Sequence, residues 1–184
     1  MQVPYRKPGK YSLLPKDPVM TKAKLFELQK KLEKLKSIQP AAAKEVTRLA
    51  ELGDFSENVE YQLAKGRLRG INQGILDLEK QINSADIITA PKQNKRIEVG
   101  HTIVVEVNGK EKQFQILGSS ESKPEFGIIS QNSPIGSALL GHEVGDSIEI
   151  LVGNKKIQYT IVKIVLGDLD SNQDRQLQKL SSYH

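Results

Sequence analysis

The sequence predicts an α+β protein, with an antiparallel helical hairpin followed by a small β-sheet domain that carries one short helix. Three observations lead to this fold class. Apolar residues recur at alternating spacings of three and four through residues 25–85, which is typical of amphipathic helices. A short acidic break at residues 53–58 divides that run, and from Ile97 onward the apolar period changes to two. A chain of 184 residues has room for one rod and one compact unit.

The two helical arms each present one apolar seam. In the first arm the seam positions are Leu25, Leu28, Leu32, Leu35, Gln39, Ala42, Val46 and Leu49. In the second arm they are Tyr61, Ala64, Leu68, Ile71, Ile75, Leu78, Ile82 and Ala85. Because the connection is short, the arms should pack as antiparallel neighbours along these seams. The 28 residues from Leu25 to Leu52 make the first arm about 42 Å long.

Pro40 interrupts the first arm on the side away from the seam. Proline lacks an amide hydrogen and clashes with the preceding helical turn, so we expect a kink there or a restart of the helix after Ser37.

The second half of the sequence predicts an antiparallel sheet with a short helix. Asn108-Gly109 is a strong hairpin signal between two alternating segments, and Ser133 with Pro134 is a helix-start pattern for a helix that stops at Gly141. The expected strands are residues 102–107, 113–117, 126–130, 147–152 and 156–166, the last two joined by a turn at Gly153-Asn154.

The expected organisation is therefore a basic irregular extension at 1–19, the coiled-coil hairpin at 20–90 with its acidic tip at 53–58, a sheet domain at 96–166 and a polar tail at 167–184. Leu177 and Leu180 could form one helical turn in that tail. The extension has four basic residues against one acid, Asp17, and we predict that it contacts nucleic acid or an acidic protein surface.

Composition excludes several classes of function. The sequence has no cysteine, which removes disulfides and thiolate metal sites and fits a reducing cytosol. Its three histidines are scattered, and no apolar run approaches the length of a membrane span. We expect neither a membrane segment nor a secretory signal. The net charge of +5 permits contact with a polyanion without requiring it.

Asp54 and Glu57 at the expected tip have two interpretations. As a structural pattern, Gly53 would end the first helix and Asp54-x-x-Glu57 would form a capping box for the second. As a functional pattern, two carboxylates three residues apart could share a Mg²⁺ ion whose other ligands come from a partner. The two interpretations are compatible, because a capping carboxylate keeps a free oxygen.

Basic residues lie behind the tip on both arms, at Lys44, Arg48, Lys65, Arg67 and Arg69. They could hold a phosphate backbone while the carboxylates present a metal. The structural alternative is ordinary helix-surface charge paired at spacings of three and four.

Two segments carry a resemblance to a known family. Residues 52–62, LGDFSENVEYQ, resemble the tip signature of the bacterial Gre factors (GreA/GreB), which are transcript cleavage and elongation factors of RNA polymerase. Residues 129–135, ISQNSPI, with the following ALLG at 138–141 and EVGD at 143–146, resemble that family's C-terminal domain, which has an FKBP-like fold. With the heptads, the resemblance covers residues 20–166.

The resemblance implies a cofactor for another enzyme rather than a free-standing enzyme. In that family the C-terminal domain docks on RNA polymerase and the coiled coil enters the secondary channel, where its tip stimulates cleavage of backtracked RNA. By this likeness Asp54 and Glu57 would be the catalytic residues and would hold Mg²⁺ jointly with the polymerase. Lys65, Arg67 and Arg69, with Lys44 and Arg48 nearby, would meet the nascent RNA 3′ end. Asn132, Ser133 and Pro134 would bind the polymerase. The implied setting is a cytoplasmic monomer with no membrane partner.

Three other functions stay open at this stage. A Gre-like inhibitor would enter the same channel without stimulating cleavage, although the intact Asp54-x-x-Glu57 pattern argues against it. A prolyl isomerase would need an aromatic pocket, for which the sheet domain offers Phe114, Phe126 and Tyr159 but no tryptophan. A coiled-coil adaptor without chemistry would use the tip carboxylates only as caps.

Overall fold

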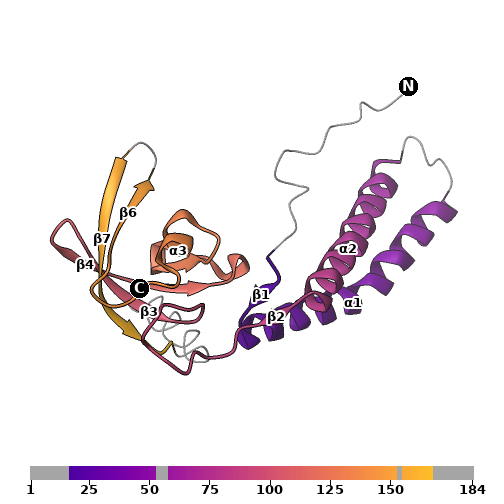
Figure 1. Cartoon of the computed structure of the whole chain (residues 1–184). Coiled ribbons are helices and arrows are strands. Elements are labelled where there is room, and N and C mark those ends of the chain that lie inside the picture. The colour runs from indigo at the N-terminus through magenta and orange to yellow at the C-terminus, as the bar shows by residue number, and fades with distance from the viewer. Residues whose placement is uncertain (1–16, 53–57, 153–154, 168–184) are drawn as a thin grey trace, which may run out of the picture.

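The computed structural model describes residues 17–52, 58–152 and 155–167, and it has the predicted α+β architecture. Two long helices, α1 (Lys22–Glu51) and α2 (Val59–Asn83), form a hairpin that projects from a five-stranded sheet unit (Figure 1). The predicted tail, most of the basic extension and the turn at 153–154 lie outside the described residues. No described helix combines the length and apolar character that a membrane crossing requires.

The predicted seams hold the hairpin together. Each of the sixteen seam residues is buried or half-buried, and Leu28, Leu49, Ile71 and Ile75 are the most completely buried. Cross-helix polar contacts fix the antiparallel register. The only polar seam residue, Gln39, donates from Nε2 to Asn72 Oδ1 at 2.7 Å, and Lys36 pairs with Glu79 at 2.6 Å.

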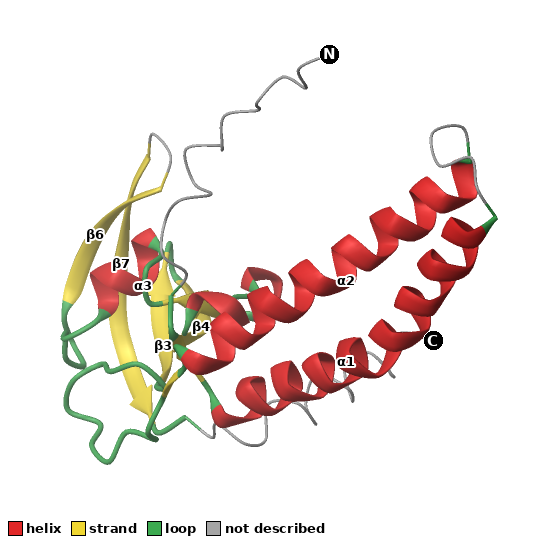
Figure 2. Ribbon diagram, turned by 90° about the vertical axis from the view of Figure 1, so that its right-hand side faces the viewer, coloured by secondary structure: helices red, strands yellow, loops and turns green. Residues whose placement is uncertain are grey.

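Helix α1 runs through Pro40 without interruption, so the predicted restart after Ser37 is wrong. Figure 2 shows the helix curving along its length instead of breaking. The continuous apolar contact with α2 on the opposite side explains why the missing hydrogen bond at Pro40 is tolerated, since that proline is exposed.

We expect Pro40→Ala to raise the free energy of unfolding by about 2 kcal/mol. Alanine is favoured over proline in a helix interior by about 3 kcal/mol. The substitution also increases the conformational entropy of the unfolded chain, which lowers the stability by about 1 kcal/mol. Chemical denaturation measures the change, with the nearby exposed Ser37→Ala as a control that should stay within about 0.5 kcal/mol. An unchanged or lowered stability would show that the proline bend itself contributes to packing.

The sheet unit is built from β3 (Thr102–Val107), β4 (Lys110–Leu117), β5 (Ile128–Ser130), β6 (Ser147–Val152) and β7 (Lys155–Val165), in the order β5-β4-β3-β7-β6. The predicted hairpin turn is confirmed. Asn108 and Gly109 both have positive φ, 53° and 72°, which is the backbone shape of a two-residue turn that matches strand twist.

One pairing differs from the predicted antiparallel sheet. Strand β5 runs parallel to β4, with Ile129 opposite Ile116. The connection between them crosses over through two short 3-10 helices, η1 (Ser119–Glu121) and η2 (Pro124–Phe126), and this crossover returns the chain in the same direction. The other three pairings are antiparallel.

Helix α3 (Pro134–Leu139) closes the core of the sheet unit. Ser133 caps it by accepting a hydrogen bond from the Gly136 amide at 3.0 Å, and Pro134 occupies its first turn, as predicted. Leu139 is completely buried against the sheet. The buried core comprises Ile97, Ile103, Val105, Val107, Ile116, Ile129, Leu139, Ile150, Tyr159, Ile161 and Ile164.

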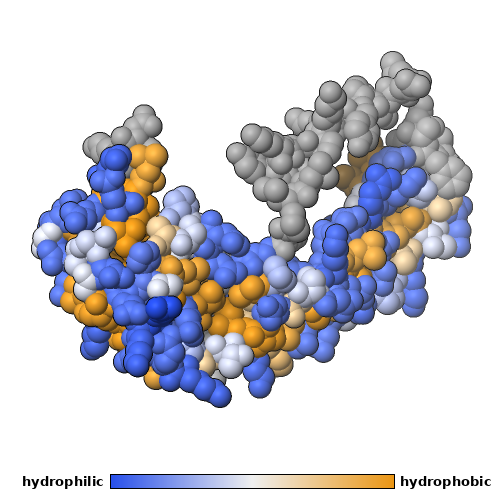
Figure 3. Space-filling model, viewed as in Figure 1, coloured by the Kyte–Doolittle hydropathy of each residue, from blue (hydrophilic) through white to orange (hydrophobic). Residues whose placement is uncertain are grey.

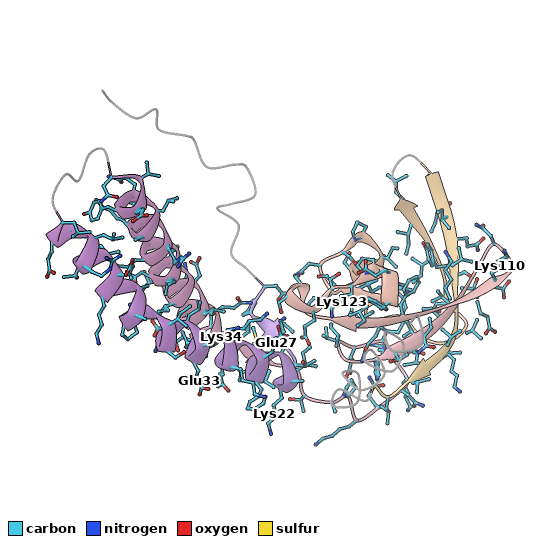
Figure 4. All side chains as sticks on the ribbon, turned by 180° about the vertical axis from the view of Figure 1, so that it is seen from behind. Lys22, Glu27, Glu33, Lys34, Lys110 and Lys123 are labelled. Carbon is cyan, nitrogen blue, oxygen red and sulfur yellow. The ribbon has the colours of Figure 1, made fainter. Side chains whose placement is uncertain are left out.

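The base of the hairpin is tied to the sheet unit by a feature that the sequence did not predict. Strand β1 (Val19–Met20) pairs in parallel with β2 (Asp86–Ile87), so the predicted irregular extension is already ordered at its last residues. Met20 is completely buried. Gly118 lies so close that a Cβ atom there would sit 1.7 Å from the Val19 carbonyl oxygen. Figure 4 shows Lys22 and Glu27 at this base and Lys110 at the far end of the sheet unit.

Candidate functional site

The C-terminal end of α1 and the N-terminal end of α2, which the loop at residues 53–57 joins in sequence, lie at the end of the hairpin farthest from the sheet unit (Figures 1 and 2). Asp54 and Glu57, the candidate catalytic and metal-binding residues, fall in this loop and lie outside the described residues. The flanking residues are described. Helix α1 ends with Leu52 as its C-cap, and α2 begins after Asn58.

Asn58 is the N-cap of α2, because its side-chain Oδ1 accepts a hydrogen bond from the Tyr61 amide at 3.1 Å. The prediction that Asp54 starts the second helix as part of a capping box is therefore wrong. The asparagine adjacent to the helix, a residue type favoured as an N-cap, takes the role instead. The N-cap position of α2 therefore belongs to Asn58.

Large apolar side chains surround the ends of the two helices. Leu52, Val59 and Leu63 are 67%, 69% and 70% exposed. Val59 and Leu63 are four residues apart on α2 and lie off the seam. This spacing is the sequence signal that could have predicted a second, exposed apolar face at the start of α2. Apolar groups gathered at one exposed end are typical of a contact surface for another macromolecule.

The five candidate RNA-binding residues are all exposed, but they differ in how far their charge is neutralised. Arg48 forms a two-pronged ion pair with Glu45, from Nε to Oε2 at 3.0 Å and from Nη2 to Oε1 at 2.8 Å. This hydrogen-bonded pair lowers the pKa of Glu45 and raises the pKa of Arg48. Arg67 also lies within electrostatic reach of Glu45, across the hairpin.

The remaining basic residues keep more of their positive charge available. Lys65 Nζ stands 5.7 Å from the centre of the Tyr61 ring, a contact that leaves its charge intact. Within residues 17–52 and 58–152, neither Lys44 nor Arg69 takes part in an ion pair. Among the described residues, Lys44, Lys65 and Arg69 are therefore the candidate basic residues for which no neighbouring carboxylate is recorded.

A shallow groove runs between the helices on the tip side of Pro40. The small seam residues Ala42 and Ala64 leave a space of about 290 Å³, with Glu45 and Arg67 at its rim. Figure 3 shows apolar surface along the visible flank of the hairpin, bordered by hydrophilic residues.

Asn132, Ser133 and Pro134, the candidate polymerase-binding residues, lie at the start of α3 in the sheet unit. The Ser133 side chain has a structural role, since its hydroxyl donates to the Ser130 carbonyl at 2.7 Å and caps the helix. Asn132 and Pro134 are exposed. The structure does not bring this segment together with the basic residues of the hairpin. The two groups lie on separate parts of the molecule (Figure 1).

Asp17 is a functional candidate that the sequence analysis missed. Its carboxylate accepts hydrogen bonds from Asn132 Nδ2 at 3.0 Å and from the Ser119 amide at 2.9 Å, across more than 100 residues of sequence. Thr21 makes a similar long-range contact, donating from its amide and hydroxyl to Glu121 at 2.7 and 2.6 Å. No local sequence pattern predicts either contact. The only available signal was that Asp17 is the single acidic residue in a basic extension.

The described residues contain no group of three or more His, Cys, Asp or Glu side chains placed to hold a metal. His101 is buried, with Nδ1 accepting from the Glu98 amide at 2.8 Å and Nε2 placed 2.7 Å from the Gln93 carbonyl. His142 pairs with Asp146 at 3.1 Å. Both rings therefore serve the local structure of the sheet unit.

The aromatic residues that a prolyl isomerase would need do not line a common pocket. Tyr159 is buried in the core with Phe114 packed against it, and Phe126 is exposed on η2.

Comparison with known proteins matches two family profiles to this chain. The profile described as "Transcription elongation factor, N-terminal" (GreA_GreB_N) matches residues 18–87, which include the hairpin. The profile described as "Transcription elongation factor, GreA/GreB, C-term" matches residues 92–165, which include the sheet unit.

Two sequence relatives agree with these matches. The transcription elongation factor GreA of Nautilia profundicola is 39% identical over 156 residues, which covers 82% of this chain and 95% of the relative. GreA of Paracoccus denitrificans is 33% identical over 148 residues, covering 79% and 95%. Among solved structures, the GreA factor homolog 1 (Gfh1) of Thermus thermophilus is 27% identical, covers 79% of this chain and 97% of that one, and superposes with a TM-score of 0.37.

Proposed function

The chain belongs to the GreA/GreB family of transcription elongation factors, and from this premise we propose that it binds bacterial RNA polymerase and stimulates cleavage of backtracked RNA. In this proposal the hairpin enters the secondary channel and the sheet unit docks outside it. The nuclease activity belongs to the polymerase, and this chain acts as its cofactor.

One observation carries the proposal, namely the projection of the helical hairpin away from the sheet unit. Helix α1 has 30 residues, so the rod is about 45 Å long, and the helix ends that flank residues 53–57 lie far from the sheet unit of the same molecule (Figure 2). The continuous apolar seam makes the rod stiff enough to carry side chains into a deep cavity. An adaptor that only joined two proteins would not need its acidic residues at the outermost point.

The chemistry of the tip residues fits Mg²⁺ shared with a partner. Two carboxylates are hard oxygen ligands, and Mg²⁺ in phosphoryl chemistry takes one or two of them and leaves its other positions to water and phosphate. Asn58 caps α2, so the start of this helix does not require a capping carboxylate. When bound, the ion would neutralise charge on the scissile phosphate, and the two carboxylates would orient it and a water molecule.

The charges behind the tip supply the second part of the proposal. Lys44, Lys65 and Arg69 would hold the extruded RNA 3′ end by its phosphates, and Arg67 and Arg48 would contribute less because Glu45 offsets them. Asn132 and Pro134 would contact the polymerase at the mouth of the channel. The remaining expectations, a cytoplasmic monomer without a membrane partner, belong to the same proposal.

Binding to core RNA polymerase is the first test. Gel filtration or fluorescence anisotropy with the labelled chain should show a 1:1 complex that survives moderate salt. A chain that fails to associate with either core enzyme or a stalled elongation complex would rule the proposal out.

We expect Arg69→Ala to weaken action on backtracked complexes more than Arg48→Ala. Removing one phosphate contact to a single strand should reduce the slope of log affinity against log salt by about 0.7. The measurement is the half-maximal protein concentration for cleavage at several KCl concentrations. Arg69→Ala should lower that slope by this amount, whereas Arg48→Ala should change it by less than half as much, because its guanidinium is already paired. Equal slopes for both variants would remove the RNA-contact role from Arg69.

A further inference from the structure

The N-terminal residues just before α1 lie against the segment that precedes α3. Asp17 is the centre of this contact. Its Oδ2 accepts from the Ser119 amide at 2.9 Å, from the Ser119 hydroxyl at 2.9 Å and from Asn132 Nδ2 at 3.0 Å. Gln131 Nε2 lies 3.2 and 3.3 Å from its two oxygens. One carboxylate therefore holds two consecutive side-chain amides.

These contacts fix Asn132 at both ends although it is exposed. Its backbone amide donates to Ser130 Oγ at 3.0 Å, and its side-chain amide donates to Asp17 and also to Ser119 Oγ at 3.3 Å. The Ser119 and Ser130 hydroxyls are themselves linked at 2.8 Å. An exposed asparagine ordinarily samples several rotamers, whereas this one is held in a single orientation before any partner arrives.

The charge state of Asp17 suits this role. Burial raises the pKa of its carboxyl group, but hydrogen bonds from the Ser119 amide and hydroxyl, the Val19 amide and Gln131 outweigh burial and hold the pKa below its ordinary value. The group is therefore ionised at neutral pH, and its hydrogen bonds to the amides are charge-assisted.

We propose that Asp17 is a positioning residue that presets Asn132, and with it the Asn132–Pro134 segment, for docking on RNA polymerase. The inference rests on the proposed function, because it assigns the docking step to that segment. Binding of a partner costs free energy for each flexible side chain that it immobilises. Asp17 removes that cost for Gln131 and Asn132 in advance, so it should act on affinity and leave the chemistry at the distant hairpin tip unchanged.

The simpler role of Asp17 would be a structural tie between the hairpin and the sheet unit. The same junction contains a matched control for that role. Glu121 accepts from the Thr21 amide at 2.7 Å and from the Thr21 hydroxyl at 2.6 Å, and it ties the same N-terminal residues to η1. Both of these hydrogen bonds come from Thr21, so neither of them holds Gln131 or Asn132.

The experiment compares Asp17→Ala, Glu121→Ala, Asn132→Ala and the Asp17→Ala/Asn132→Ala double variant. Three quantities are measured on the full chain: the thermal unfolding midpoint, the half-saturating concentration with stalled polymerase complexes, and the cleavage rate at saturation. Asp17→Ala should raise the half-saturating concentration roughly tenfold and leave the saturated rate unchanged. The double variant should bind like Asn132→Ala alone, because Asp17 acts through Asn132. Glu121→Ala should lower the unfolding midpoint while its half-saturating concentration stays within about twofold.

Two outcomes would overturn the inference while the proposed function stands. One is an unchanged affinity of Asp17→Ala when the wild-type chain binds, and the other is an equal fall in affinity for Asp17→Ala and Glu121→Ala. Failure of the wild-type chain to bind polymerase at all would instead reject the proposed function.

A measurement on the free protein covers the case in which Asp17→Ala does not fold. The side-chain amide NMR signals of Gln131 and Asn132 should titrate together, with a midpoint below the ordinary aspartate pKa of about 3.9. Because the folded pKa is depressed, the hydrogen bonds to Asp17 are present at higher pH and break as pH falls through that midpoint. Amide signals that do not move in this range would contradict the positioning role.

Discussion

Replacing both Asp54 and Glu57 by alanine is expected to reduce RNA cleavage by about 10²- to 10³-fold while binding to RNA polymerase is kept. This is the size of effect found when a group that stabilises charge in a transition state is removed. Binding should survive because the proposed docking residues lie in the sheet unit, far from the end of the hairpin where α1 ends and α2 begins (Figure 1). The measurement is the single-turnover release rate of short 3′ RNA fragments from backtracked complexes at saturating protein.

Stability provides the control for this variant. If the two carboxylates served as helix caps, their removal would cost about 1 kcal/mol. Asn58 caps α2 here, so we expect the unfolding free energy of the double variant to stay within about 0.5 kcal/mol of the wild type. The isosteric pair Asp54→Asn and Glu57→Gln should reduce cleavage by a similar factor, because a neutral amide binds Mg²⁺ more weakly than a carboxylate does. A variant that is destabilised yet cleaves normally would support the adaptor function instead.

Gly118→Ala is expected to destabilise the protein by about 3 kcal/mol, at the upper end of overpacking costs. The new Cβ atom would lie 1.7 Å from the Val19 carbonyl oxygen and 2.7 Å from its carbonyl carbon. Both atoms belong to the backbone of β1, which pairs with β2, so a small rotation of a flexible side chain cannot relieve the clash. The unfolding midpoint should fall by roughly 6 to 12 °C.

Gly66→Ala is the matched control for that substitution. Gly66 lies in the exposed interior of α2, and nothing lies within 4 Å of a Cβ atom built there. Alanine should therefore stabilise the protein by about 1 kcal/mol through helix propensity. If Gly118→Ala proved as harmless as Gly66→Ala, the close approach of Gly118 to β1 would not exist in solution.

The elements that the sequence predicted are those set by local patterns. The hairpin seam follows from a 3-4 spacing that sixteen positions obey, and the turn at Asn108-Gly109 follows from residues that tolerate positive φ. The start of α3 follows from a serine cap and a proline at its first turn. Each of these signals lies within a few residues of the structure that it specifies, so one sequence is sufficient to read it.

The features that escaped prediction depend on contacts between distant residues. The parallel direction of β5 depends on how a ten-residue connection crosses the sheet, and β1 pairs with a strand more than 60 residues away. Asp17 reaches Asn132 across 115 residues. Periodicity and propensity carry no information about such partners. The contacts of β1 and Asp17 follow from the fold, which places the N-terminal residues against η1.

The candidate site was predicted only in part, again because some of its features depend on side-chain contacts that local sequence patterns do not specify. Sequence likeness suggested the tip carboxylates as catalytic residues and Asn132–Pro134 as a docking segment, and the structure describes Asn132–Pro134 but not the carboxylates. The helices position the basic residues as expected, but the pairing of Arg48 with Glu45 decides which charges remain available, and that depends on side-chain geometry. The exposed Leu52, Val59 and Leu63 were hidden among many apolar residues of the hairpin.

The most direct test of the proposed function uses wild-type protein, purified RNA polymerase and elongation complexes backtracked by a known number of nucleotides with a labelled RNA 3′ end. We predict rapid release of a short labelled 3′ fragment, followed by resumed elongation when nucleotides are added. Slower elongation without any fragment above the background of polymerase alone would contradict cleavage stimulation and would indicate an inhibitor that occupies the same channel.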